Sequence, residues 1–199
     1  MAIAAVVAAL AQVATGAPAN PGPATVASMV ALYDEVCLRT FPDDAAVDRA
    51  MAKRKATALT PEQVKVTLHD DPGRGWVVRG AGVPVMVMLE LPPFHACSVR
   101  ALVGDGPHDL TGLKTVTEAY KQSHPGFTAE PVFEGERGGI RIRAENEVRR
   151  LPDGTADALM VIDQRVTDPA QLGPGQTAAP LRFVHQIKRA APPGGETPQ

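Results

Sequence analysis

Apolar residues recur at helical spacing in the first third of the chain. Their 3.6-residue period predicts a helix over residues 26–37, and Pro42 prevents its continuation. A second helix is expected over residues 45–56, because two aspartates just before it can cap its N-terminus. Thr60-Pro61-Glu62-Gln63 has the form of a capping box, so a third, short helix should begin there.

Alternating apolar and polar positions follow this region and predict strands in two groups of three. One helix, over residues 110–122, separates the two groups. Tight turns or proline breaks join most consecutive strands, which favours antiparallel pairing. The strands are expected at residues 76–78, 83–91, 96–103, 140–149, 158–166 and 181–188.

This order of elements predicts an α+β fold. The N-terminal helices and the middle helix should pack on one face of a mostly antiparallel, curved sheet. The order resembles that of cone-shaped folds such as the cystatin-like and nuclear-transport-factor-2-like groups. That resemblance rests on element order alone and implies no function. The sequence shows no internal repeat.

The two ends of the chain differ in composition from the part between them. An uncharged apolar run, residues 2–14, leads into Ala17-Pro18-Ala19, which has the small-x-small form of a signal-peptidase site. Residues 1–19 are therefore predicted to be a signal peptide, although no Lys or Arg precedes the run; an alanine-rich surface helix is the alternative. Residues 20–189 should form a single α+β domain, and the Pro- and Gly-rich residues 190–199 a disordered tail.

Cys37 and Cys97 are the two cysteines of the chain, and their spacing is not that of a C-x-x-C redox motif. The periodicity places Cys37 on the buried stripe of a helix and Cys97 on the buried side of a strand. In an oxidising compartment two such cysteines usually pair. We therefore predict a disulfide that joins a helix to the sheet, in a periplasmic or secreted bacterial protein.

Composition narrows the classes of partner. Of the 199 residues 44% are hydrophobic and 21% charged, and the formal net charge is -2. Nucleic-acid-binding proteins usually carry a basic face and interleaved aromatic residues, whereas aromatics make up only 4% of this chain. No nucleic-acid partner is expected. The N-terminal apolar run is also shorter than the roughly 20 residues that a membrane-spanning helix needs, so no membrane span is expected.

No motif indicates a cofactor or a metal site. The glycine-rich stretches at residues 70–75 and 135–139 lack the spacing of phosphate-binding loops and fit connections between strands. His69, Asp70 and Asp71 are adjacent in sequence, so their side chains diverge and a solvated turn is the simpler interpretation. We therefore expect no cofactor and no metal.

The leading functional hypothesis is a non-enzymatic binding module for an unknown protein or small-molecule ligand. The open face of the sheet would carry the contact, with Trp76, Arg141 and Arg143 as candidate contact residues. The two arginines belong to a row of alternating charges, for which cross-strand ion pairs are the simpler interpretation. The more specific interpretation is that Arg141 and Arg143 hold an anionic ligand, with Arg182 beside them.

His95 is a further candidate, since it lies two residues before Cys97 and a thiol nucleophile needs a nearby base. A disulfide at Cys97 would remove that nucleophile. The alternative hypothesis is therefore a small hydrolase or isomerase with a pocket inside the curved sheet. In it His95 is the base, helped by Asp70, Asp71 or Glu90.

A third hypothesis is a carrier of apolar ligands. Residues 85–89 are apolar at every position, as in a strand buried on both faces. Met86 and Met88 could instead line a ligand cavity, which would have a volume of about 300 Å³ or more.

Overall fold

The computed structural model describes residues 23–79, 83–103, 107–171 and 180–188. The predicted signal peptide and C-terminal tail lie outside these ranges. The helices and helical turns are α1 (Pro23–Leu32), the π-helical turn η1 (Tyr33–Leu38) that continues it, α2 (Asp44–Lys53), α3 (Pro61–Thr67), α4 (Thr111–Ser123) and the 3-10 turn η2 (Pro169–Gln171).

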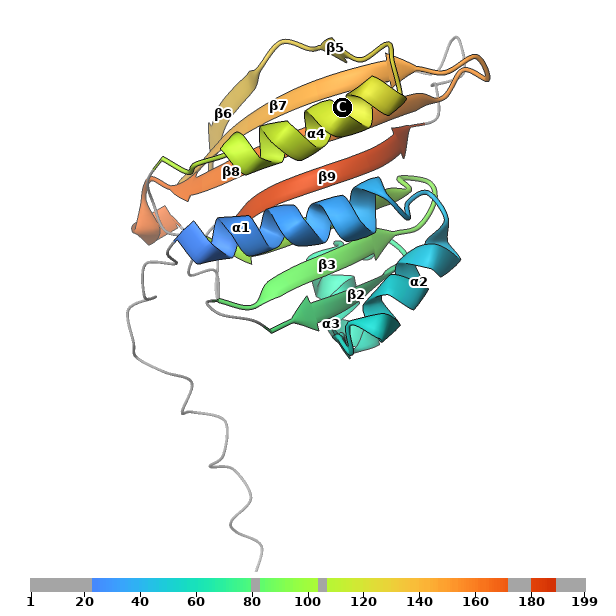
Figure 1. The fold of residues 1–199 in the computed structure, drawn as a ribbon. Coiled ribbons are helices and arrows are strands. Elements are labelled where there is room, and N and C mark those ends of the chain that lie inside the picture. The colour runs from blue at the N-terminus through green and yellow to red at the C-terminus, as the bar shows by residue number, and fades with distance from the viewer. Residues whose placement is uncertain (1–22, 80–82, 104–106, 172–179, 189–199) are drawn as a thin grey trace, which may run out of the picture.

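The described strands form one antiparallel sheet in the order β1-β2-β3-β4-β9-β8-β7-β5, with β6 also paired to β7 (Figure 1). The strands are β1 (Thr57–Ala58), β2 (Gly73–Val78), β3 (Val85–Glu90), β4 (Ala96–Leu102), β5 (Thr128–Ala129), β6 (Phe133–Arg137), β7 (Ile140–Arg150), β8 (Ala156–Val166) and β9 (Pro180–Lys188).

The two groups of strands meet in the middle of the sheet, where β4 pairs with β9. Val99 lies opposite Phe183, and Cys97 opposite His185. Each group follows a helix, because α1 precedes β2 to β4 and α4 precedes β7 to β9. The two helices lie side by side on one face of the sheet (Figure 1). The topology therefore repeats, although the sequence shows no repeat.

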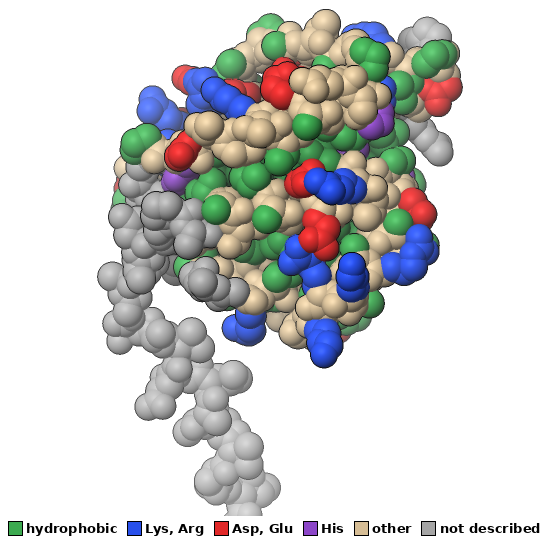
Figure 2. Space-filling model, in the orientation of Figure 1, with side chains coloured by type: hydrophobic (Ala, Val, Ile, Leu, Met, Phe, Trp, Pro, Cys, Tyr) green, Lys and Arg blue, Asp and Glu red, His purple; other side chains and the backbone are tan. Residues whose placement is uncertain are grey.

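The main hydrophobic core lies between the sheet and the layer of α1, η1, α2 and α4. Its largest fully buried residues include Tyr33 and Phe183, whose rings meet edge to face at 5.8 Å. The Tyr33 hydroxyl donates to the Val184 carbonyl at 2.9 Å, which satisfies the one polar atom of its side chain. Figure 2 shows this helix-bearing side, with hydrophobic side chains gathered in the band between α1 and α4.

The predicted disulfide is confirmed. Cys37 on η1 and Cys97 on β4 are bonded with an S–S distance of 1.98 Å, and both are fully buried. The bond closes a loop with a sequence separation of 60 residues. Loop closure on this scale contributes about 4 kcal/mol in the chain-entropy description of disulfides. The helical layer is thus covalently joined to the central strand.

α3 packs on the opposite face of the sheet, unlike the other helices. Its Val64 and Leu68 contact Met88, whose neighbours in β3 point into the main core. Glycines in β2 make this approach possible, because a Cβ on Gly73 would lie 2.3 Å from Leu68 Cδ1, and one on Gly75 2.6 Å from the Met88 sulfur. The expected packing on one face therefore holds for α1, α2 and α4, and α3 departs from it.

The predicted α+β class and its antiparallel sheet are confirmed. The capping box is present too, since Gln63 N donates to Thr60 Oγ1 and Thr60 N to Gln63 Oε1.

The sequence pattern missed β1, β5 and β6. Residues 135–139, expected to be a loop, contain the end of β6 and a tight turn in which Gly138 and Gly139 both have positive φ. No helix in the described ranges is long and apolar enough to cross a membrane.

Candidate functional site

Strand β7 turns its charged side toward α4 and its apolar side away from it. Glu147 lies opposite Leu159, a residue of the main core, and its carboxylate accepts a hydrogen bond from Lys121 of α4 at 2.8 Å. Because side chains alternate along a strand, Ile142 and Ala144 project from the other face of the sheet. We call this second face, opposite α1, α2 and α4, the open face; α3 covers its β2 and β3 part.

Apolar side chains extend across the open face onto the strands that flank β7. Ala144 lies between Ile162 of β8 and Phe133 of β6 in the cross-strand register. Phe133 is 59% exposed, and the others are only half-buried. Contiguous exposed apolar surface commonly marks an interaction site. We define the open-face patch as Phe133, Ile142, Ala144, Met160 and Ile162.

Arg100 and Arg182 lie opposite each other beside this patch. The register pairs Arg100 of β4 with Arg182 of β9, and Arg182 with Ile162. Arg100 is only 8% exposed, and Arg182 is half-buried. Like charges directly opposite in neighbouring strands destabilise a sheet, and burial increases that cost. A carboxylate between two such guanidinium groups would offset it.

The hydrogen-bond partners of the two arginines are all neutral. Arg100 donates from Nε to Ser98 Oγ at 2.9 Å and from Nη1 to the Thr67 carbonyl at 3.4 Å. Arg182 donates from Nη2 to Gln164 Oε1 at 3.1 Å, while its Nε is buried with no hydrogen-bond partner in the described ranges. No described carboxylate reaches ion-pair distance of either guanidinium.

Glu90, at the end of β3, is the acidic residue whose charge the two arginines feel. Burial, together with the negative charge of Asp71, raises the pKa of Glu90 against the lowering effect of Arg100 and Arg182. Burial and the positive charge of Arg182 lower the pKa of Arg100 to about 10, although the negative charge of Glu90 raises it. An arginine with this pKa is still protonated at neutral pH. The cluster therefore keeps an excess of positive charge.

Trp76, Arg141 and Arg143 are not on the open face, which corrects their expected position. Trp76 packs against the main core from β2, at the far side of the sheet from β7. Arg141 and Arg143 lie on the helix-bearing side of β7. Arg143 donates to Glu145 of the same strand at 2.8 Å and pairs across to Glu134 of β6, so the ion-pair interpretation holds for Arg143.

Arg182 is not beside Arg141 and Arg143 either. Arg182 lies opposite Ile162, whereas Arg143 lies opposite Asp163, and adjacent residues of β8 point to opposite faces. The sequence pattern identifies two sides of each strand. It does not say which side meets the helices, and β7 reverses the expected assignment.

His95 lies just before β4, away from the other candidates. Its Nε2 is 2.9 Å from Asp44 Oδ1, so its carboxylate partner is Asp44 rather than Asp70, Asp71 or Glu90. Fully buried side chains of the main core fill most of the helix-bearing face, where a catalytic pocket was expected. A cavity of about 260 Å³ remains between α4 and β8, and His95 does not line it. The structure thus brings Arg141 and Arg143 together, in a pocket of about 230 Å³ that Arg165, Glu134 and Asp163 also line, but Trp76 and His95 do not line it. His95 is likewise not joined by Asp70, Asp71 or Glu90.

The apolar strand of the carrier hypothesis is buried on both faces. Val87 and Leu89 point into the main core, and Met88 is fully buried beneath α3. Met86 lies half-buried opposite Arg100. Side chains of α3 therefore occupy the space that a ligand would need beside Met88.

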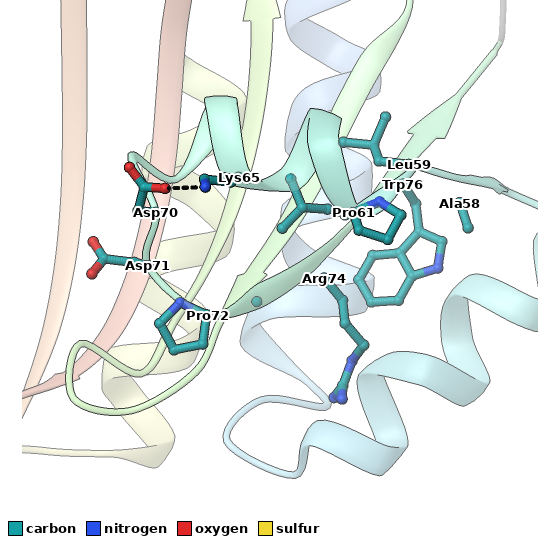
Figure 3. Close-up of a pocket in the computed structure, with 12 residues that line it drawn as sticks. Ala58, Leu59, Pro61, Lys65, Asp70, Asp71, Pro72, Arg74 and Trp76 are labelled. Carbon is teal, nitrogen blue, oxygen red and sulfur yellow. Dashed lines mark ion pairs between the residues drawn. The ribbon is translucent and has the colours of Figure 1, made fainter.

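A groove of about 510 Å³ runs between α3 and the β2 edge of the sheet (Figure 3). Its basic residues already have partners. Lys65 pairs with Asp70 at 3.1 Å, and Arg74 pairs with Asp48 of α2 at 3.1 Å. This groove therefore lacks the uncompensated positive charge found at Arg100 and Arg182.

A buried polar network crosses the main core at the disulfide. His185 Nδ1 lies 2.7 Å from the Cys37 carbonyl oxygen, and its Nε2 lies 2.9 Å from Asp157 Oδ1. The two contacts, one on each ring nitrogen, fix the orientation of the His185 ring. Tyr120 and Arg149 donate to the other oxygen of Asp157, at 3.1 and 2.8 Å. His185 and Asp157 are 0% and 1% exposed, so this network serves structure rather than binding.

Comparison of the chain with protein-family models, with curated proteins and with solved structures finds no match in any of the three. The resemblance to cone-shaped folds therefore remains one of element order.

Sequence reasoning did not select Arg100, and it placed Arg182 beside Arg141 and Arg143 instead of beside Arg100. One signal was present, because Arg100 is the one charged residue in the predicted strand 96–103. A charged residue in a central strand is unusual unless it is paired. Its juxtaposition with Arg182 depends on a pairing between strands distant in sequence.

Proposed function

We propose that the chain is an exported, non-enzymatic binding module whose open face docks an amphipathic helix of a partner protein. The observation that carries the proposal is the orientation of β7, which directs charged residues at its own helix α4 and leaves the open-face patch without a helix among the described elements. The disulfide fits an oxidising compartment, in agreement with export.

A helix is the occupant that this face accepts elsewhere. α3 already packs on its β2 and β3 part through Val64 and Leu68. A sheet with one apolar face is stabilised when a helical layer covers it. A partner helix lying beside α3 would extend the same layer over the open-face patch, with its apolar residues at helical spacing.

Charge selects a partner protein over segments of this chain. The occupant must bring a carboxylate to Arg100 and Arg182, and residues 1–22 contain no Asp or Glu. Glu196 is the one acidic residue of 189–199, but it lies in a Pro- and Gly-rich stretch whose composition disfavours a helix. A second copy of the open face would bring the same two arginines together with a single Glu90. The proposed occupant is therefore a helix with an acidic residue at the centre of its apolar face.

The hydrolase or isomerase hypothesis has one favourable observation, the hydrogen bond between His95 and Asp44. A histidine–carboxylate pair of this kind orients a general base. Neither His95 nor Asp44 lines the cavity between α4 and β8, which favours binding over catalysis. The carrier hypothesis has no comparable support, because α3 buries Met88.

The proposal is tested with a displayed library of 18-residue peptides designed as amphipathic helices. The central position of the apolar face is varied among Glu, Gln and Lys, and the library is selected on the full chain. Glu-centred peptides should be enriched. Replacing Phe133 by Asp should weaken their binding at least about tenfold, the equivalent of 1.4 kcal/mol.

Phe94 provides the matched control. It is an aromatic residue between β3 and β4 that is 48% exposed, so Phe94→Asp makes the same change outside the open-face patch. This variant should bind the selected peptides as tightly as the unchanged chain does. Equal losses in both variants, or no preference for a central Glu, would contradict the proposal.

A further inference from the structure

We propose that Arg100 and Arg182 form an oxyanion subsite that takes one carboxylate or phosphate group. This inference rests on the proposed function, because the group it receives is the acidic residue of the docked helix. It goes further in predicting that the subsite also binds a free oxyanion when no partner is present.

Two neighbouring strands, β4 and β9, supply the two arginines of the subsite. The contacts that hold each arginine use only some of its N–H groups. Arg100 is held by Ser98 and by the last carbonyl of α3, at Thr67. Arg182 is held through Gln164, and its buried Nε has no acceptor among the described residues. A guanidinium has five N–H donors, so each arginine can still offer donors to a shared oxyanion.

An oxyanion between the two guanidinium groups would turn a repulsive pair into an attractive triad. Arginine binds carboxylate and phosphate through two parallel N–H···O bonds, and such charge-assisted bonds are short and strong. The partial burial of the site strengthens them further, because fewer water molecules compete. A chloride ion, which cannot accept two parallel bonds in this geometry, should bind less well.

Glu90 competes with the incoming anion. It is half-buried, and its charge interacts with Arg100 and Arg182. It does not reach ion-pair distance of either, so it weakens anion binding without closing the site. Removing its charge should therefore tighten the binding of an oxyanion.

The experiment measures the thermal unfolding of the full chain with inorganic phosphate or acetate against sodium chloride at matched ionic strength. At about ten times its dissociation constant, phosphate should raise Tm by about 3–5 °C over chloride. Arg182→Met should abolish this difference and Glu90→Gln should enlarge it. Arg143→Met should preserve it, because Arg143 is paired with Glu134 and Glu145.

A second measurement, by NMR on the unchanged chain, tests the subsite even if a variant folds poorly. In the unchanged chain, phosphate should shift the NMR signals of the Nε–H groups of Arg100 and Arg182 but not that of Arg143. Equal Tm in phosphate and chloride without such shifts would overturn the subsite, as would a phosphate effect that survives in Arg182→Met. If the selected peptides bind but phosphate has no effect, the oxyanion subsite is contradicted and the docking proposal is not. If phosphate has an effect but no peptide binds, the docking proposal is contradicted and the subsite is not.

Discussion

His185 and Asp157 form a fully buried histidine–carboxylate pair, in which His185 Nε2 lies 2.9 Å from Asp157 Oδ1. The other ring nitrogen of His185 donates to the carbonyl of disulfide-bonded Cys37. The His185 ring therefore links β9, β8 and η1 at the centre of the molecule. Such a pair is costly to break, because removal of one partner leaves the other charge buried.

Replacing His185 by Leu should lower the free energy of unfolding by about 3–5 kcal/mol. Asp157 would lose its contact with His185 and stay buried, and the Cys37 carbonyl would lose the donor that His185 supplies. Urea denaturation measures the change. His69→Asn is the control, since His69 is exposed and has a positive φ that asparagine tolerates, and it should change stability little. A loss below about 1 kcal/mol in His185→Leu would show that the network contributes little, in conflict with its expected cost.

Acid should destabilise the protein through Asp157. Burial raises the pKa of Asp157, but hydrogen bonds and positive charge from His185 and Arg149 outweigh burial and lower the pKa. The resulting stabilisation is fully present above about pH 4, the ordinary pKa of an unfolded aspartate, and is lost as the pH falls through the lower folded value. Asp157→Asn should therefore flatten the acid limb of unfolding free energy against pH. Parallel curves for the two proteins would contradict this assignment.

The contact between α3 and β2 should depend on the absence of a Cβ at Gly73. That atom would lie 2.3 Å from Leu68 Cδ1 and 2.6 Å from the Leu89 carbonyl oxygen, and the backbone atom cannot move aside cheaply. Gly73→Ala should destabilise the protein by about 1–3 kcal/mol in chemical denaturation.

Gly112 in α4 is the matched control for this substitution. Its Cβ would meet only Val30 methyl groups, at 3.7 and 4.0 Å. Gly112→Ala should leave stability unchanged or raise it by up to about 1 kcal/mol, since alanine favours a helix. If both variants lost stability equally, close packing of α3 would not be the cause.

Loss of the disulfide should cost about 2–5 kcal/mol, the usual range for a native bond in a small exported domain. The double variant Cys37→Ala, Cys97→Ala is compared with the oxidised chain by thermal unfolding. Both sites are fully buried next to His185, so the variant also tests whether the polar network holds η1 on the sheet unaided. An unchanged Tm would show that the bond adds nothing to the packing.

Much of the fold could be predicted from local patterns, because helix periodicity, strand alternation and turn residues act over short distances. The cysteine pair was predictable for the same reason, since each cysteine lies on the apolar side of its own element. β6 escaped prediction because Gly135 interrupts a short edge strand whose Phe133 is exposed. Its pairing with β7 compensates for this weak local pattern.

The candidate site could not be predicted, because it depends on which strands pair and which face each strand turns to the helices. Arg100 and Arg182 are neighbours only through the β4–β9 register. The charged row of β7 looked solvent-facing in the sequence, yet Glu147 of that row binds Lys121 of α4. His185 and Asp157 likewise meet only through the packing of β8 against β9.

The most direct test of the binding proposal is a double-mutant cycle between Arg182 and the central Glu of a selected helical peptide. Isothermal titration gives the affinities of the full chain and of Arg182→Met for the Glu-centred peptide and its Gln analogue. The proposal predicts a coupling energy of at least about 1.5 kcal/mol, as measured for close charge pairs across interfaces. A coupling energy of zero, with both variants still folded, would contradict it.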